Sequence, residues 1–559
     1  MLLKRWQALR DKAYLKNLLV ILAIAIIGLS TVGNYGITWD ETVEVDMVRW
    51  NLDYIRSDKP IERDSKYYGF YFNYISQLIH EATEEVARTL NPDSVKEPAH
   101  ITTDRQRWVY QMWKHTRTKH VVTFLFSLIA YASVIGIVSI LAGKENAWLG
   151  AIVLALFPGF WGHSFFNPKD IPFATMFTLA TLGGSKLLNL YFSAELSTLS
   201  IGKNRVTIGS FIFGILVGLV TGIRVGGFFL LSFIIMAQIV AKPDLKSVTL
   251  TLRRFWKFYG LIFLGWAVTC YIIYPSAWRN PVDWFIGAVT TMSNYSLWNN
   301  DVLFDGQYIP GRSLPWYYLP RLISITVPVL FQVAFIGGII AIAARYKGLT
   351  PAQRGCAVLT LLQAFILPSL AIIKGSTMYD GMRHSLFVLP AMAAIATTAL
   401  IWLYEKLPRK PKLVKIFAVT LLITNLGVIA YDMLGLHPYE YAYFNRAYGG
   451  LRGAFQKQET DYWGLSLREA TEWFNKNAEP NSSLVVAGPG FGFEMYVDPA
   501  LNIHMTHRDD FQWGKAPDPD YYMGIHRYDY YKAFPQCPIV HAVTRQETSL
   551  AIIRKCSTN

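Results

Sequence analysis

The chain has 559 residues, of which 52% are hydrophobic and 15% are aromatic, and its formal net charge is +14. This apolar composition argues against a nucleic-acid-binding protein and favours a polytopic membrane protein. Because cations in membrane proteins follow the orientation of the chain, each basic segment has to be assigned to one side of the bilayer before it indicates a ligand.

Eleven apolar segments are long enough to cross roughly 30 Å of hydrocarbon. They predict an α-helical membrane domain over residues 17-433. The expected spans lie near 17-33, 120-141, 146-163, 171-190, 207-222, 225-241, 258-275, 322-343, 355-373, 386-404 and 415-433.

A basic tail of residues 1-16 precedes the first span, and it contains Lys4, Arg5, Arg10, Lys12 and Lys16. Further Lys and Arg residues crowd the short loops on the same side, which is therefore cytoplasmic by the positive-inside rule. These residues account for the basic excess, so we expect no nucleic-acid partner. No clear small-residue cleavage site follows the first span, which favours an uncleaved anchor over a signal peptide.

This orientation places the longest loops outside, over residues 34-119, 161-171, 276-321 and 374-385, together with the C-terminal region 434-559. Apolar residues recur at three- and four-residue steps within 71-90 and 282-294, which predicts amphipathic helices lying at the membrane surface. They either wall a cavity at the membrane boundary or simply close the end of the helix bundle.

The predicted outer side also carries acidic and basic residues at the ends of the spans. Asp40 and Glu41 lie at the mouth of the first span, although Glu41 could merely cap a helix. Cations gather at outer helix ends and need an anionic partner, either lipid headgroups in general or one phosphate carried on a lipid. They are Lys114, Arg117, Lys119, Arg224, Arg279, Lys374, Arg383 and His384.

Two shorter clusters complete the candidate site. Asp170 follows Lys169 and precedes an Ile-Pro pair. It either takes part in substrate binding or only marks the start of a helix. His163 has no second ligand at metal spacing, so we predict no cofactor and leave a divalent metal open. A second cluster, before the tenth span, either faces the cavity or is only solvated; it contains Tyr379, Asp380, Arg383 and His384.

The C-terminal region 434-559 predicts a small α+β domain, with a helix at LREATEWFNK and a strand at SSLVVA. Its GPGFGF segment lacks the residues of a nucleotide-binding loop. A hairpin turning at Gln546-Glu547 would bring Cys537 opposite Cys556, which predicts a disulfide; the alternative is two free thiols near the terminus.

The strings ITWDE, NPKDIPFA, YDGMRH, HPYEYAYFN and ETDYWG, in this order along the topology, resemble bacterial GT-C glycosyltransferases. The resemblance is to the branch of the protein O-mannosyltransferases and lipid A aminoarabinose transferases, and it covers roughly residues 17-465. It implies an inverting transfer of a sugar from a polyprenyl-phosphate donor to an acceptor hydroxyl, at the outer face of the bacterial inner membrane. The acceptor would be a protein, a lipid or a glycan.

The resemblance also assigns roles. Asp40 matches the catalytic base and Asp170 a second functional acid. Because neighbouring carboxylates rarely do the same job, we expect a supporting or structural role for Glu41. The donor phosphate would be bound by Arg117, Lys119, Arg224 and Arg383, with Arg279 behind them. Lys169, His163, Tyr379, Asp380 and His384 would line the cavity, and the aromatic loop 294-318 would close over it.

Two other classes of protein fit many spans and charged loops. A transporter or flippase of a lipid-linked glycan would place charges near the bilayer midplane and show internal repeats, whereas here the charges gather at one surface and no repeat is evident. A noncatalytic scaffold leaves Asp40 and the outer cations unexplained.

Overall fold

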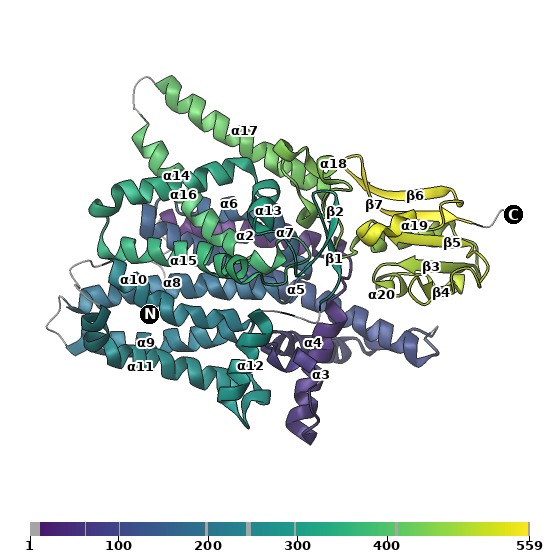
Figure 1. Cartoon of the computed structure of the whole chain (residues 1–559), viewed down its shortest axis with the longest axis horizontal. Coiled ribbons are helices and arrows are strands. Elements are labelled where there is room, and N and C mark those ends of the chain that lie inside the picture. Colours follow the sequence, from purple (N-terminus) through teal and green to yellow (C-terminus); the bar gives the residue numbers. More distant parts are fainter. Residues whose placement is uncertain are drawn as a thin grey trace.

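A computed structural model describes residues 12-61, 63-99, 101-195, 200-241, 248-293, 295, 298-407 and 412-556. The predicted basic residues Lys4, Arg5 and Arg10 lie outside these ranges. A bundle of long helices forms the larger part of the molecule, and a smaller domain built around a sheet lies at one end of it (Figure 1).

The bundle contains, within the described residues, nine helices that are long and apolar enough to cross a membrane. The prediction of a polytopic α-helical fold is thereby confirmed. These helices are α2 (Lys12–Thr31), α5 (Asp104–Ala142), α8 (Asp170–Glu195), α9 (Ser200–Thr221), α11 (Val248–Ile273), α14 (Val329–Arg345), α15 (Pro351–Lys374), α16 (Val388–Lys406) and α17 (Lys412–Leu436).

The other two predicted spans are helical but interrupted. Residues 146-163 fall on α6 (Leu149–Ala155) and α7 (Pro158–Phe166), which meet at an angle of 75°. Phe157 is extended and Pro158 starts a new helix, as expected from the restriction that proline imposes on the residue before it. Residues 225-241 form a 3-10 turn followed by the shorter α10 (Leu230–Ala241).

The segments predicted to lie outside the membrane contain further helices and a hairpin. The amphipathic helices expected over 71-90 and 282-294 are α4 and α12, and the apolar side chains of α4, among them Val86 and Leu90, are exposed. The outer elements are α3 (Glu41–Ser57), α4 (Tyr71–Leu90), α12 (Pro281–Ser293), β1 (Asp301–Phe304), β2 (Gln307–Pro310) and α13 (Tyr318–Thr326).

The C-terminal domain has a five-stranded sheet with the order β4-β3-β5-β7-β6, in which β3 is parallel to β4 and β5 while β7 is antiparallel to both of its neighbours. The small C-terminal α+β domain is therefore confirmed. Its elements are α18 (Gly450–Ala454), α19 (Ser466–Asn477), β3 (Ser483–Ala487), α20 (Gly490–Glu494), β4 (His504–His507), β5 (Tyr521–Ile525), β6 (Ile539–Arg545) and β7 (Thr548–Lys555).

The last two strands form the hairpin expected around Gln546 and Glu547, both of which have the positive φ of a tight hairpin turn. Just beyond the strands, Cys537 and Cys556 form a disulfide with a Cα–Cα distance of 4.6 Å. The GPGFGF segment contributes α20, a helix of five residues.

The C-terminal region also holds the segment that leads from α2 into α3. The Tyr35 hydroxyl donates to Glu440 at 2.9 Å, and Arg468 donates to the Tyr35 carbonyl at 3.2 Å. Gly36 passes so close to the backbone that a Cβ atom there would lie 2.7 Å from the carbonyl oxygen of Leu465. The chain just before Asp40 is thus fixed against residues far away in the sequence.

Candidate functional site

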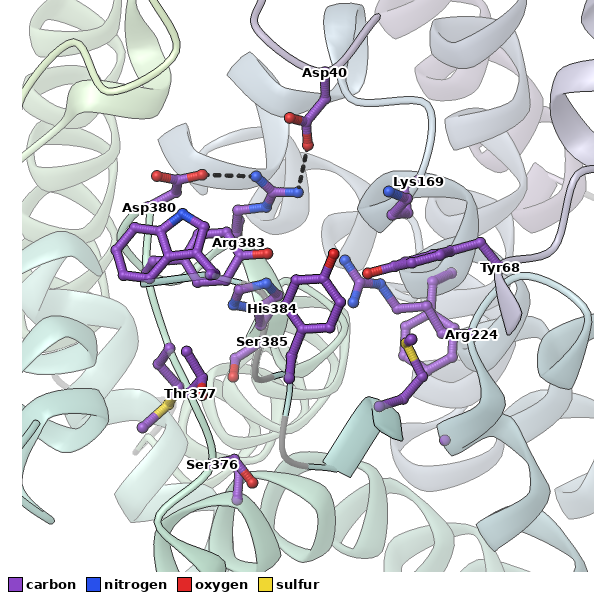
Figure 2. A pocket seen from close by; sticks show the side chains of 18 of the residues that line it. Asp40, Tyr68, Lys169, Arg224, Ser376, Thr377, Asp380, Arg383, His384 and Ser385 are labelled. Atoms are coloured by element: carbon purple, nitrogen blue, oxygen red, sulfur yellow. Dashed lines mark hydrogen bonds and ion pairs between the residues drawn. The ribbon is translucent and has the colours of Figure 1, made fainter. Parts of the chain in front are cut away.

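A cavity of about 1240 Å³ lies where the outer loops meet the helix bundle and the C-terminal domain. Figure 2 shows several of its charged side chains, which come from the start of α3, the segment before α8, the segment after α9 and the loop after α15. Apolar side chains from the segment before α10 and from α15 also line it, namely Ile223, Val225, Phe228, Phe229, Leu367 and Leu370.

Arg383 is the centre of the charged cluster. Its Nη2 donates to Asp40 at 2.7 Å, its Nη1 to Asp380 at 2.7 Å and its Nε to Asp170 at 3.2 Å. In Figure 2 Asp40 and Asp380 approach the guanidinium from different sides. Burial lowers the pKa of Arg383, but the three carboxylates outweigh it and hold that pKa well above its usual range. Three carboxylates therefore share one buried cation.

Asp40 differs from the other two carboxylates because it is open to solvent. Its side chain is 36% exposed, compared with 2% for Asp170 and 8% for Asp380. Burial raises the pKa of Asp40, but Arg383 and Lys169 lower it below its usual value. Asp40 is consequently ionised at neutral pH and is the carboxylate of this cluster that a proton donor from solution can reach.

Glu41 lies next to Asp40 in the sequence but does not line the cavity. Its buried carboxylate accepts hydrogen bonds from the Thr38 backbone N–H at 2.8 Å and the Thr38 hydroxyl at 3.0 Å, and it contacts Nε2 of His120 at 2.7 Å. Successive residues in a helix point about 100° apart, which separates the two acids. Glu41 thus fixes the turn that presents Asp40.

Glu44, one helical turn after Asp40, is a cavity residue that the sequence analysis missed. It accepts a hydrogen bond from Asn73 at 2.6 Å and pairs with Lys169, whose ammonium lies 4.3 Å from the centre of the Tyr68 ring. The signal was available, because residues four apart in a helix share one face. Glu44 holds Lys169 at the edge of the cavity beside Asp40.

Asp170 is the first residue of α8 and lies behind the cavity wall. It accepts hydrogen bonds from Asn167 at 2.9 Å and from Arg383, and it pairs with Arg224. Arg224 itself lines the cavity. Asp170 therefore orients two arginines, while Arg383, Arg224 and Lys169 present positive charge to the cavity.

The structure does not bring three of the predicted phosphate ligands into the cavity lining. Arg117 is exposed and stacks on Trp113 at 4.7 Å. Arg279 is 72% exposed and pairs with Asp58 at the surface. Lys119 is buried near Glu41 and Glu44 without lining the cavity.

His163 is likewise outside the main cavity. It is buried, and its ring nitrogens contact the Tyr462 hydroxyl and the Asn167 amide, each at 3.2 Å. Among the described residues, no group of three or more His, Cys, Asp or Glu side chains is arranged to hold a metal ion.

The remaining predicted residues do line the cavity. Tyr379 stacks on Trp298 with ring centroids 4.3 Å apart, and His384 meets Tyr379 edge-on at 4.7 Å. Burial, together with Arg383 and Arg224, holds the pKa of His384 well below its usual value, so its ring is neutral. The stack brings the aromatic loop 294-318 onto the loop that carries Arg383.

The C-terminal domain forms part of the cavity wall, which the sequence analysis did not anticipate. Arg527 is the most deeply placed of its residues; it donates to Asp380 at 2.5 Å and to the Tyr462 carbonyl at 2.7 Å. The wall residues from this domain are Arg508, Asp509, Arg527, Tyr528 and Tyr530. The domain is therefore a component of the site and not an appendage to the bundle.

Comparison with known proteins finds no matching family model and no matching curated protein. Three solved structures are similar in fold. ArnT from Cupriavidus metallidurans bound to undecaprenyl phosphate is 12% identical over 96% of this chain and 97% of that one, with a TM-score of 0.45. Its apo state is 12% identical over 99% and 98% of the two chains, with a TM-score of 0.47. The Archaeoglobus fulgidus oligosaccharyltransferase tethered with an acceptor peptide is 11% identical over 89% and 64%, with a TM-score of 0.48. Identities and scores at this level do not transfer an activity.

Proposed function

We propose that this protein is an inverting glycosyltransferase, which moves a sugar from a polyprenyl-phosphate donor to an acceptor hydroxyl at the outer face of a bacterial inner membrane. One observation carries the proposal. Asp40, an ionised and solvent-open carboxylate, lies beside Arg383 and Lys169 in a cavity that also has an apolar lining. A base, a phosphate site and a lipid-compatible wall are what this reaction requires.

The reaction follows from these groups. The free carboxylate oxygen of Asp40 takes the proton of the acceptor hydroxyl as the acceptor oxygen attacks the anomeric carbon. The bond from that carbon to the phosphate oxygen breaks on the opposite face, which inverts the configuration. Its electron pair leaves with the polyprenyl phosphate, and Arg383, Arg224 and Lys169 stabilise the negative charge that develops there.

The apolar lining supports a lipid-linked donor. Val225, Phe228 and Phe229 precede α10, and Leu367 and Leu370 face the same cavity from α15. Such a wall offers hydrogen bonds to neither a nucleotide nor a free sugar, whereas it lowers the free energy of a prenyl chain removed from water. The charged residues of the cavity would thus bind the phosphate of the donor, and the apolar residues its prenyl chain.

The orientation is supported by charges at the far end of the bundle. Helix α15 reaches the cavity loop at its C-terminal end, so its N-terminal end lies on the other side. Arg345, Lys347 and Arg354 surround that end. By the positive-inside rule this side is cytoplasmic, and the cavity faces the outside.

The test is transfer by the full-length protein in liposomes, supplied with radiolabelled polyprenyl-phosphate sugars and a panel of protein, lipid and glycan acceptors. We expect Asp40→Asn to lower the transfer rate by about 10²- to 10⁴-fold, the usual contribution of a general base. Asp46→Asn is the matched control, because Asp46 lies on α3, the helix that begins just after Asp40, and pairs with Arg49. Undiminished transfer by Asp40→Asn shows that Asp40 is not the base. Flipping of a lipid-linked glycan without sugar consumption identifies a flippase instead.

A further inference from the structure

Arg527 enters the site from the C-terminal domain through an unusual piece of backbone. It lies two residues beyond the end of β5, and the next residues, Tyr528 and Asp529, have φ values of 53° and 57°. Two consecutive non-glycine residues in the left-handed region are uncommon and require surrounding contacts to hold them. The turn carries the Arg527 side chain, which is only 7% exposed, into the cavity wall.

Those surrounding contacts come from the hairpin of β1 and β2 and from the segment before α19. Burial raises the pKa of the Tyr308 hydroxyl in β2, Asp529 lies near enough to raise that pKa further, and Gln456 donates to the Tyr531 hydroxyl at 2.8 Å. Gln458 in turn donates to Asp305, in the turn of the hairpin, at 2.7 Å. Two segments, which are bonded to each other, therefore hold the turn after Arg527.

Inside the wall, Arg527 and Arg383 share one carboxylate. Arg527 Nη2 donates to Oδ1 of Asp380 at 2.5 Å, and Arg383 Nη1 donates to Oδ2 of the same residue at 2.7 Å. Arg527 Nε also lies 3.6 Å from the Glu459 carboxylate, which is buried beside Asp380. Asp380 thus joins an arginine of the C-terminal domain to the arginine at the centre of the cluster.

We infer that Arg527 is a positioning residue: by neutralising Asp380 and Glu459, it leaves Arg383 free to serve Asp40 and the donor phosphate. This inference rests on the proposed glycosyl transfer. The C-terminal domain accordingly acts on the donor phosphate indirectly, through the contacts of Arg527 with Asp380 and of Asp380 with Arg383.

The distribution of counter-charges supports this reading. Without Arg527, Asp380 would lose one of its two arginine partners and Glu459 its neighbouring cation, and a buried carboxylate that lacks partners is costly. Arg383 is the remaining cation bonded to Asp380 in the described part of the chain. Asp170 keeps Arg224 as a second partner.

Asp40 has fewer cationic partners than Asp170. Its single direct ion pair among the described residues is with Arg383, and Lys169 and Asp170 act on it only from a distance. A guanidinium drawn toward Asp380 is therefore taken mainly from Asp40 and from the phosphate site.

The experiment compares wild type, Arg527→Gln, Arg527→Lys and the double variant Arg527→Gln/Asp380→Asn as full-length proteins in nanodiscs. We measure the affinity for undecaprenyl phosphate, and kcat and the acceptor KM as functions of pH. We expect Arg527→Gln to weaken undecaprenyl phosphate binding and to lower kcat, each by about 10- to 100-fold, the size of a coupling within one charged network. The acid limb of kcat should move to higher pH, because Asp40 loses counter-charge, while the acceptor KM stays unchanged.

The variants separate positioning from support of the fold. Arg527→Lys keeps the charge and should recover part of the loss. Asp380→Asn removes the carboxylate that competes for Arg383, so the double variant should regain binding and kcat relative to Arg527→Gln alone. The control is Arg452→Gln, an exposed arginine paired with the exposed Glu547 in the same domain.

Three results would overturn the inference. The first is an Arg527→Gln protein that melts like wild type and keeps its affinity for undecaprenyl phosphate and its pH profile. The second is a rise in the acceptor KM alone, which would make Arg527 an acceptor ligand. The third is a double variant no better than the single one. A wild-type protein that neither binds undecaprenyl phosphate nor transfers sugar would instead refute the proposed function itself.

Discussion

The substitution Arg383→Lys separates the charge of the central cation from its geometry. Arginine contacts Asp40, Asp170 and Asp380 through three different nitrogens, at 2.7, 3.2 and 2.7 Å. A lysine keeps the positive charge but is a single point that cannot span three carboxylates. At least one of the three contacts should therefore be lost. We expect two to be lost, because one ammonium replaces three separate nitrogens.

The magnitude follows from the partners that remain. Hydrogen bonds to charged groups contribute about 1.5 to 3 kcal/mol each, so two lost bonds amount to about 3 to 6 kcal/mol before any recovery by the new ammonium. Asp170 keeps Arg224 and Asp380 keeps Arg527, which limits the loss of folding stability. The donor phosphate keeps Arg224 and Lys169 but loses the arginine at the centre of the cluster. We expect the transfer rate to fall by about 10²- to 10³-fold, as when one preorganised donor to a developing anion is removed.

The assay is single-turnover transfer from a radiolabelled polyprenyl-phosphate sugar, with the melting temperature recorded for the same samples. Arg279→Lys is the control, because Arg279 is an exposed arginine whose partner, Asp58, is also at the surface. A rate for Arg383→Lys within about threefold of wild type would refute the reasoning, since charge alone would then suffice. An equal loss in Arg279→Lys would show that phosphate binding extends outside the cavity.

Three further outcomes are expected. Burial raises the pKa of Glu459 to about 7. The contribution of Glu459 to folding stability is therefore largest below its unfolded pKa and is lost as the pH rises toward 7. Glu459→Gln should raise the melting temperature relative to wild type more at pH 8 than at pH 5. Glu41→Gln weakens the buried contact with His120 and should destabilise the fold by about 1 to 3 kcal/mol in chemical unfolding, with a smaller loss of kcat than Asp40→Asn because Glu41 only fixes the turn that presents Asp40. Replacing Cys537 and Cys556 by serine opens a loop with a sequence separation of 19 and should cost about 3 kcal/mol, so that reductant lowers the melting temperature of wild type but not of the variant.

The fold was predictable because hydrophobic length and turn chemistry are local properties. The membrane helices, the surface helix over 71-90 and the hairpin at Gln546 and Glu547 all follow from short stretches of sequence. Pro158 also marks the interruption in the sequence, but the length of the apolar segment alone does not reveal it. Residues 146-163 are long enough to cross a membrane even though they are bent by 75°.

The site was predictable only in part, because side-chain direction and tertiary contacts decide it. Glu41 and Glu44 lie on the same short helix, and the helical period turns only Glu44 toward the cavity. Arg117 lies within α5, which begins at Asp104, and Arg279 lies just before α12; the side chains of both face solvent. No local pattern marks Arg527, since its partner Asp380 is 147 residues away.

The participation of residues 508-530 in the cavity wall has a consequence for how the protein is made. A ribosome synthesises the chain from its N-terminus, so the helix bundle and Asp40 enter the membrane long before these residues exist. Until the segment carrying Arg527 has been synthesised and folded against the bundle, Asp380 lacks one of its two arginine partners. Nascent chains in the membrane therefore carry an incomplete cavity wall, which is completed only when the last domain folds.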